Sequence, residues 1–495
     1  MPGQSPIPPR FLERMESLLG GEYESFARAL DELPKSGLRV NTLKISPEEF
    51  KGISALALGE RVDWCPSAFH LTPSEISPGL HPHHLAGLYY LQDPSAMAPA
   101  ELLAPRPGER VLDLAAAPGG KATHLAAMMR GQGLLVANEI KTRRVGHLAQ
   151  NLERWGAANV VITNESPEAL ADHFGPFFDR VLLDAPCSGE GMFRKDMGAR
   201  ADWSPEMVAG CALRQSAIVR VAAKLVRPGG YLLYSTCTFA PEENEAVIAG
   251  LLRATTARNG MQFQVMELPL NKGFSRGRPE WITPTGGRAD GAQGMGNNSA
   301  LPADSAVKSL EGAVRLFPHR MQGEGHFACL LQRVPSADQR MEEPKLRSDR
   351  LPVPSKQQAG FWRNFAAEAL VVGLPDERLR VVGDRLYMVP HEIPDPGRLR
   401  IVHPGVWLGK LKMDRFEPAH PLALFLHRGQ ARQTVELAAG DPRLAAYLRG
   451  ESFAAEGPPG WTLVTVDGFP LGWGKCVQGV LKNHLPRGWI PGGGR

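Results

Sequence analysis

The sequence lacks any apolar run long enough to cross a membrane. No stretch of roughly 18 or more residues, the least that predicts a membrane-spanning helix, is continuously apolar in this chain of 495 residues. The N-terminus also lacks a basic segment followed by an apolar one, so no secretory signal peptide is predicted. These absences favour a cytoplasmic protein with no membrane partner.

Cysteine is scarce and widely spaced. The six cysteines show neither metal-ligand spacing nor the density of a disulfide framework. A reduced protein without a metal site is therefore expected. The six positions are Cys65, Cys187, Cys211, Cys237, Cys329 and Cys476.

The composition shows no strong bias. Hydrophobic residues make up 43% of the chain and charged residues 22%, ordinary values that exclude a disordered, collagenous or coiled-coil chain. No internal repeat is present. At roughly 150 residues per domain, the length predicts about three domains.

Basic charge is concentrated in the last third of the chain. Residues 346–495 carry 20 Lys and Arg against 14 Asp and Glu, whereas residues 1–345 carry 36 against 38. Such asymmetry indicates either a polyanionic partner or a solvated basic tail.

The middle of the chain alternates short apolar strands with helical segments, as in a parallel sheet covered by helices on both faces. Residues 272–308, rich in Gly, Ser, Asn and Pro, predict a long loop. We divide the chain into 1–95, with mixed α/β pattern; 96–336, the core; 337–357, a polar linker; and two β-rich regions, 358–427 and 428–495. The core strands are expected at 110–114, 134–138, 159–163, 180–186, 231–237 and 326–334.

A glycine-containing turn follows the first core strand. It reads Asp113-Leu-Ala-Ala-Ala-Pro-Gly-Gly-Lys121 and opens a predicted helix. Glycine lets the backbone approach a ligand closely, and the helix N-terminus offers free N–H groups. The motif is neither a P-loop nor a dinucleotide fingerprint. A tight structural turn accounts equally well for the motif taken alone.

An acid, Glu139, follows the second core strand. A carboxylate there can bind both ribose hydroxyls of a nucleoside. Its position 26 residues after Asp113 favours this role over an exposed acid at a helix entry.

Two cysteines follow two further strands. Cys187 lies in Asp184-Ala-Pro-Cys187-Ser-Gly, and Cys237 lies in Tyr234-Ser-Thr-Cys237-Thr. Because ligands bind at the carboxyl ends of parallel strands, both thiols are expected at one site, with Asp184 beside them. A thiolate is a good nucleophile only where its surroundings activate it. The other four cysteines have no such setting, and we interpret them as structural.

Together these motifs resemble the RNA 5-methylcytosine methyltransferases that include the NSUN proteins. The resemblance extends from RVNTLK at Arg39 to RLFPHR and GEGHF, which ends at Phe327, and is strongest to the bacterial RsmF/YebU branch. It implies a Rossmann-like core that uses S-adenosylmethionine (SAM) and methylates small-subunit (16S) rRNA, alone or in the 30S subunit. It further implies an RNA-binding region at 1–95, a branch-specific region at 358–427 and a PUA-like RNA-binding domain at 428–495.

The resemblance also implies residue roles. Cys237 is the nucleophile that adds to the cytosine ring, Cys187 helps to break the adduct, and Asp184 binds the ring at N3 and N4. We expect burial to raise the pKa of Asp184 so that its carboxyl carries a proton. For Arg144 a helix-surface charge is an equally good interpretation. The implied SAM-binding residues are Ala115, Ala116, Ala117, Pro118, Gly119, Gly120, Lys121, Glu139, Arg144, Asn164, Glu165 and Asp184.

The target base must leave its stack to meet both cysteines. We place RNA docking on the basic last third, beside Trp407, Trp461, Trp473 and Trp489, although any one tryptophan is more simply a core residue. A monomer is expected. Two alternatives stay open: a tRNA substrate, and a non-catalytic assembly factor, which would have no reason to keep both cysteines with Asp184. DNA enzymes of this kind lack a cysteine matching Cys237.

Overall fold

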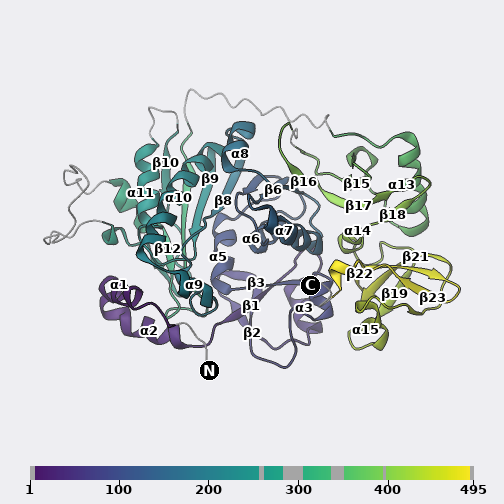
Figure 1. The fold of residues 1–495 in the computed structure, drawn as a ribbon, viewed down its shortest axis with the longest axis horizontal. Helices are drawn as coiled ribbons and strands as arrows, with labels where there is room; N and C mark the ends of the chain where they lie inside the picture. The colour runs from purple at the N-terminus through teal and green to yellow at the C-terminus, as the bar shows by residue number, and fades with distance from the viewer. Residues whose placement is uncertain (1–5, 256–260, 283–304, 336–350, 394–396, 491–495) are drawn as a thin grey trace.

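The computed structural model describes residues 6–255, 261–282, 305–335, 351–393 and 397–490, which form four sheets (Figure 1). The first sheet is antiparallel, in the order β2-β3-β1-β4. Its strands are β1 (Ser36–Val40), β2 (Leu58–Val62), β3 (Cys65–Leu71) and β4 (Tyr89–Gln92), with α3 (Pro47–Ile53) and α4 (Pro82–Leu85) between them.

The first two helices pack against the core rather than against this sheet. Phe11 of α1 (Pro9–Leu19) and Phe26 of α2 (Tyr23–Asp31) share an aromatic cluster with Phe193 and Phe239. Those two phenylalanines follow the two cysteine motifs in sequence. The N-terminal helices therefore support the part of the core where both cysteine loops lie (Figure 1).

The second sheet is the core, in the order β11-β12-β13-β9-β8-β5-β6-β7-β16, with β10 paired to β13. Five neighbouring strands are parallel, as the alternating pattern predicts. They are β5 (Arg110–Asp113), β6 (Leu134–Asn138), β7 (Val160–Thr163), β8 (Phe178–Asp184) and β9 (Val226–Thr236).

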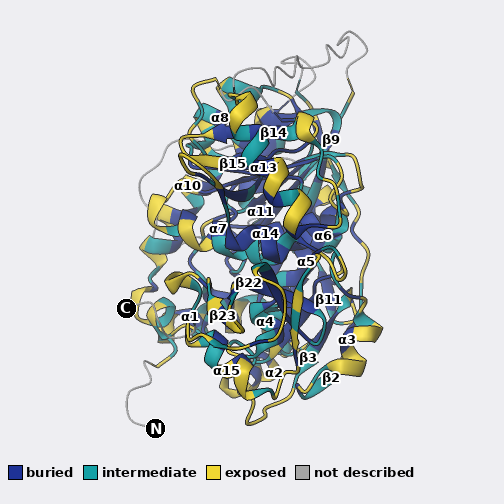
Figure 2. Cartoon of the chain, turned by 90° about the vertical axis from the view of Figure 1, so that its right-hand side faces the viewer, coloured by how far each residue is buried: buried dark blue, intermediate teal, exposed yellow. Residues whose placement is uncertain are grey.

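Helices cover both faces of this sheet, and its strands are buried between them (Figure 2). One face packs on α5 (Pro94–Leu103), α6 (Gly120–Met128) and α7 (Thr142–Trp155). The other packs on α8 (Pro167–Phe174), α10 (Pro205–Leu225) and α11 (Glu245–Ala254). The Rossmann-like α/β core expected from the sequence is confirmed.

The prediction of a long loop at residues 272–308 is partly wrong. This segment contains β11 (Phe274–Arg276), which pairs with β12 (Val314–Leu316), and α12 (Ser305–Lys308). Residues 283–304 lie outside the described part. A three-residue strand is too short for its sequence pattern to reveal. The neighbouring strands are β10 (Phe263–Met266) and β13 (His326–Arg333), the latter antiparallel to β9.

The core sheet also recruits a strand from beyond the linker. β16 (Ile401–His403) pairs with β7 at the sheet edge, so the sheet extends past residues 96–336. The region around it forms a third sheet, in the order β14-β15-β17-β18. Its elements are α13 (Lys356–Ala369), β14 (Leu379–Val382), β15 (Arg385–Met388), β17 (Val406–Leu411) and β18 (Phe416–Pro418).

The fourth sheet, in the order β19-β21-β22-β23-β20, packs beside the first one. The His83 ring lies 2.8 Å from the Asp467 carboxylate across this junction, so the N-terminal and C-terminal sheets are in contact. The elements are α14 (His420–Phe425), β19 (Thr434–Leu437), α15 (Pro442–Leu448), β20 (Phe453–Ala454), β21 (Gly460–Val466), β22 (Phe469–Val477) and β23 (Val480–Asn483).

The four C-terminal tryptophans are mainly packing residues. Trp473 is buried against Phe365, and Trp407, Trp461 and Trp489 are half-buried. Trp473 is therefore a residue of a hydrophobic core, as the simpler interpretation of the tryptophans has it. Among the described residues, no helix is long and apolar enough to cross a membrane.

Candidate active site

Both cysteine motifs lie at the carboxyl edge of the core sheet. Cys187 follows β8 and Cys237 follows β9, and these neighbouring parallel strands place the two Sγ atoms 3.2 Å apart. The two side chains that the sequence places at one edge are therefore in direct contact. Both thiols are free.

The two thiols differ in their surroundings. The contact with Cys237, together with burial and the nearby Glu243, raises the pKa of Cys187 well above its usual range. Cys187 is therefore a protonated thiol at neutral pH. Because it can donate to Cys237, it can stabilise a thiolate there.

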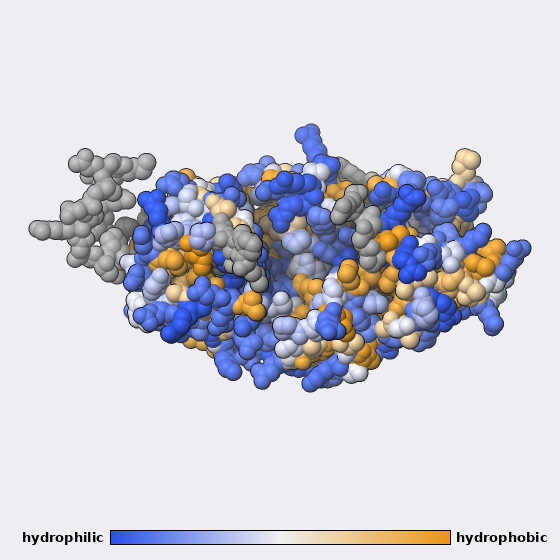
Figure 3. All heavy atoms as spheres, turned by 60° about the horizontal axis from the view of Figure 1, so that its bottom comes forward, coloured by the Kyte–Doolittle hydropathy of each residue, from blue (hydrophilic) through white to orange (hydrophobic). Residues whose placement is uncertain are grey.

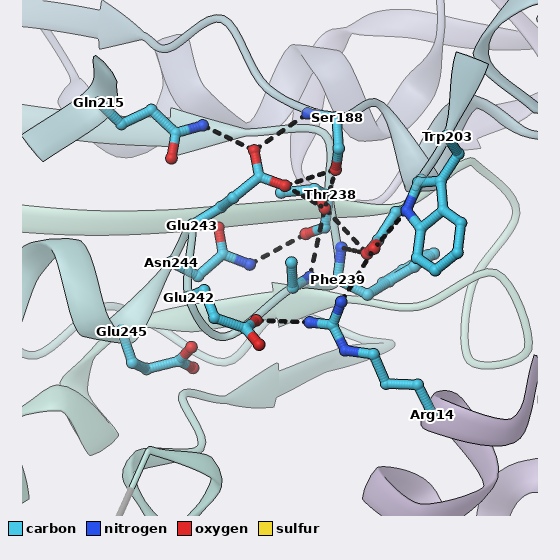
Figure 4. Close-up of polar contacts among 12 residues, drawn as sticks. Arg14, Ser188, Trp203, Gln215, Thr238, Phe239, Glu242, Glu243, Asn244 and Glu245 are labelled. Carbon is cyan, nitrogen blue, oxygen red and sulfur yellow. Dashed lines mark hydrogen bonds and ion pairs between the residues drawn. The ribbon is translucent and has the colours of Figure 1, made fainter. Parts of the chain in front are cut away.

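Hydrogen bonds between the residues that follow the two cysteines connect the two loops (Figure 4). The hydroxyl oxygens of Ser188 and Thr238 lie 2.9 Å apart. Glu243 accepts hydrogen bonds from the Ser188 N–H at 3.0 Å and from the Gln215 amide at 2.8 Å, and the Ser188 hydroxyl also contacts it. The relative position of the two thiols is therefore fixed by buried polar contacts rather than by the strands alone.

A second glutamate extends this network to the N-terminal helices (Figure 4). The fully buried Glu190 accepts hydrogen bonds from the Thr238 hydroxyl and from the Phe239 N–H, both at 2.9 Å. On its other oxygen it contacts the Trp203 ring N–H at 3.0 Å and Arg14 of α1 at 3.4 Å. Sequence reasoning missed Glu190 and Glu243 as site residues, although both lie within the motifs that carry the resemblance.

The expected pKa of Asp184 is wrong in direction. Burial raises it, but the Lys121 ammonium, 2.7 Å from Oδ2, and the Ser235 hydroxyl, 2.8 Å from Oδ1, outweigh burial and lower it. Asp184 is therefore an ionised carboxylate when no ligand is bound. The side chain of Lys121, which the resemblance assigns to the cofactor, contacts the Asp184 carboxylate.

The turn after β5 is shaped for a ligand that approaches its backbone. Gly119 has a φ of +117°, a conformation that favours glycine, and a Cβ atom there would lie 3.3 Å from Asn151. Gly119 immediately precedes α6, whose first N–H groups have no intrahelical partner. Buried Ala116 and Ala117 line the same turn. The free N–H groups at the start of α6 fit the anionic carboxylate of SAM.

Glu139 occupies the end of β6 and is buried. Its Oε1 accepts from the Lys141 N–H at 2.7 Å, and its Oε2 lies 3.2 Å from Arg144. Arg144 also donates to the Ala117 carbonyl, so it connects the turn after β5 with the turn after β6. This geometry favours a supporting role for Arg144 over that of a helix-surface charge.

The side chains of Asn164 and Glu165 form hydrogen bonds with neighbouring segments. The Asn164 amide donates to the carbonyls of Glu139 and Ile140, at 2.7 and 3.0 Å, and accepts from the Thr142 hydroxyl. Glu165 accepts from the N–H of Arg400, just before β16. Both side chains are thus engaged in joining β7 to its neighbours.

Four family models match successive parts of the chain. They are the N-terminal domain of 16S rRNA methyltransferase RsmF (residues 7–94), 16S rRNA methyltransferase RsmB/F (100–332), the RsmF first C-terminal domain (361–426) and the methyltransferase RsmF PUA domain (434–490). Together they span all four sheets.

Two curated relatives carry the name ribosomal RNA small subunit methyltransferase F. The protein from Shewanella oneidensis is 34% identical, with 94% of this chain and 92% of the relative covered. The protein from Vibrio vulnificus is 30% identical, with 97% of each chain covered.

Two solved structures from Pyrococcus horikoshii share the core fold. A methyltransferase homolog protein is 29% identical with a TM-score of 0.53, covering 66% of this chain and 95% of its own. NSun6 with SFG is 21% identical with a TM-score of 0.50, covering 66% and 99%. Together, the fold, the cysteine pair and the relatives establish that the chain belongs to the RsmF family of SAM-dependent rRNA methyltransferases of the 5-methylcytosine type.

Proposed function

We propose that this enzyme transfers a methyl group from SAM to C5 of cytosine in 16S rRNA, through a covalent bond between Cys237 and C6 of the base. The observation that carries the proposal is the pair of thiols 3.2 Å apart, at the carboxyl edge of the sheet that also holds Asp184. Both cysteines are free thiols, so either can take part in covalent chemistry.

Carbon 5 of cytosine is a weak nucleophile. When the Cys237 thiolate adds to C6, its electron pair forms the S–C6 bond, and the C5–C6 π electrons make C5 an enamine carbon that can attack a methyl group. SAM supplies that methyl as an electrophile. A water molecule then takes up the C5 proton, the C5–H electrons restore the C5–C6 double bond, and the C6–S electrons return to Cys237 as a thiolate.

The geometry supports a different role for each cysteine. Cys187 is held as a thiol beside Cys237, so it can donate a hydrogen bond to the departing thiolate and favour cleavage of the C6–S bond. We assign Cys237 as the nucleophile and Cys187 as the residue that assists release.

The proposed cofactor site comprises the turn from Ala115 to Lys121, with Glu139 at the ribose and Arg144 in support. Asn164 and Glu165 act there only through their backbone and the contacts that hold β7. The proposed substrate is 16S rRNA, free or within the 30S subunit, and the proposed state is a cytoplasmic monomer. The face of the molecule shown in Figure 3 is mostly hydrophilic, with apolar residues in small groups.

Bisulfite sequencing of rRNA and tRNA from cells with and without the gene tests this proposal. We expect at least one 16S rRNA cytosine to lose its protection from conversion when the gene is deleted, and to regain it when the wild-type gene is restored. The Cys237→Ala gene is the matched control and should not restore it. If only a tRNA cytosine lost its protection, the substrate would be tRNA instead of rRNA. If no cytosine in either RNA lost protection, the proposal would be contradicted.

A further inference from the structure

His326, the first residue of β13, presents an unused acceptor to the base-binding carboxylate. The residue is only 4% exposed, and its Nε2 has no hydrogen-bond partner among the described residues. This atom lies 4.0 Å from Oδ1 of Asp184, which is too far for a hydrogen bond. A buried polar atom without a partner costs free energy, so its retention at this place points to a ligand.

Two glycines fix the position of His326. Gly325 donates its N–H to the Gly191 carbonyl at 3.1 Å, and a Cβ atom on Gly191 would lie 2.5 Å from the Gly325 carbonyl. The segment Gly189-Glu190-Gly191, which follows Ser188, is therefore in backbone contact with Gly323-Glu324-Gly325, which precedes His326. Only glycine permits this approach, which brings β13 to the same edge as the thiols.

The hydrogen bonds of Ser95 identify which ring nitrogen carries the proton. The Ser95 hydroxyl donates its single proton to the Asp93 carboxylate. Its oxygen therefore accepts from Nδ1 of His326, 3.3 Å away. The ring proton thus lies on Nδ1, and Nε2 keeps a free lone pair.

The ring is neutral in the physiological range. Burial and the Lys121 ammonium lower the pKa of His326 to about 4, against the opposing effects of Asp184 and Asp93. At neutral pH the unoccupied Nε2 is therefore a hydrogen-bond acceptor, and it lies beside the acceptor Asp184.

We propose that Nε2 of His326 and Oδ1 of Asp184 jointly accept the two N–H bonds of the cytosine 4-amino group, which makes His326 a determinant of cytosine specificity. A nitrogen that donates two hydrogen bonds of about 2.9 Å can bridge two acceptors 4.0 Å apart. Uracil carries a carbonyl oxygen at this position and would face two acceptors, so it is rejected. This inference rests on the proposed function and on the binding of cytosine by Asp184.

The test compares two substitutions on two substrates. Asparagine at 326 retains a group near Nδ1 that can contact Ser95, whereas glutamine retains an acceptor near Nε2. Each variant is assayed under steady-state conditions for methyl transfer to 16S rRNA carrying either the target cytosine or, at that position, 2-pyrimidinone, which lacks the 4-amino group. The ratio of kcat/KM on the two substrates does not depend on the folded fraction of a preparation.

We expect His326→Asn to lower kcat/KM for cytosine at least about tenfold, the effect of leaving one buried donor unpaired, with little change for 2-pyrimidinone. His326→Gln should stay within about threefold of wild type on both substrates. Equal losses on both substrates, rescue by asparagine instead of glutamine, or no loss at all would overturn the inference. A wild-type enzyme that fails on cytosine would instead refute the proposed function.

Discussion

Replacing Cys237 by alanine is expected to lower methyl transfer on the order of 10⁴-fold or more, the scale seen when an enzyme loses its covalent nucleophile. Without the S–C6 bond, C5 of cytosine has no electron pair to offer. The measurement is single-turnover transfer of labelled methyl from SAM to 16S rRNA.

Cys476→Ala is the matched control, because Cys476 is a buried cysteine of β22 in the fourth sheet. This variant should retain most of the wild-type rate. A Cys237→Ala enzyme that turns over within tenfold of wild type would show that the reaction does not pass through this thiol.

Replacing Asp184 by asparagine should slow the chemical step at least about 10²-fold, the scale seen when one preorganised electrostatic contact to a reacting group is removed. The change removes the negative charge opposite Lys121, leaving a buried ammonium unpaired, and converts an acceptor facing the cytosine amine into a possible donor. Single-turnover rates at saturating RNA separate this effect from weaker binding. Asp202→Asn, at an exposed position of α9 (Met197–Asp202), is the control and should be neutral.

The same carboxylate sets a pH dependence. Because Lys121 and its neighbours hold the pKa of Asp184 below its usual range, the ionised form is present at neutral pH and is lost only as the pH falls through the lowered pKa. The rate contributed by Asp184 should therefore be constant from neutral pH into the mildly acidic range. The ratio of the wild-type rate to the Asp184→Asn rate isolates this contribution, because both enzymes share Cys237. A decline of that ratio centred near pH 6 or above would mean that the carboxyl is protonated more easily than the Lys121 contact allows.

The sequence predicts the parallel strands and the meeting of the cysteines because both follow from local patterns. Hydrophobic runs mark β8 and β9, and neighbouring parallel strands deliver whatever follows them to one edge. Glu139 is placed at the same edge by the same reasoning, at the end of β6.

Contacts between distant segments lie beyond such patterns. The pKa of Asp184 depends on Lys121, which lies on a different strand–helix turn, and local sequence gives no distance between them. The short β16 joins the sheet from beyond the linker. Just before it, the Arg400 carbonyl accepts from the Asn164 N–H and the Arg400 N–H donates to the Glu165 carboxylate, contacts that no local pattern predicts. The position of His326 near the thiols follows only from the contact between Gly191 and Gly325, which the sequence does not predict.

The most direct test of the central claim is a search for a covalent protein–RNA complex on a denaturing gel. Cys187→Ala and Cys237→Ala enzymes are each incubated with 16S rRNA and SAM and then denatured. We predict that Cys187→Ala retains RNA, since the bond to Cys237 forms but is not released, and that Cys237→Ala retains none. Retention by Cys237→Ala but not by Cys187→Ala would exchange the two roles, and absence of a complex from both variants would contradict the covalent mechanism.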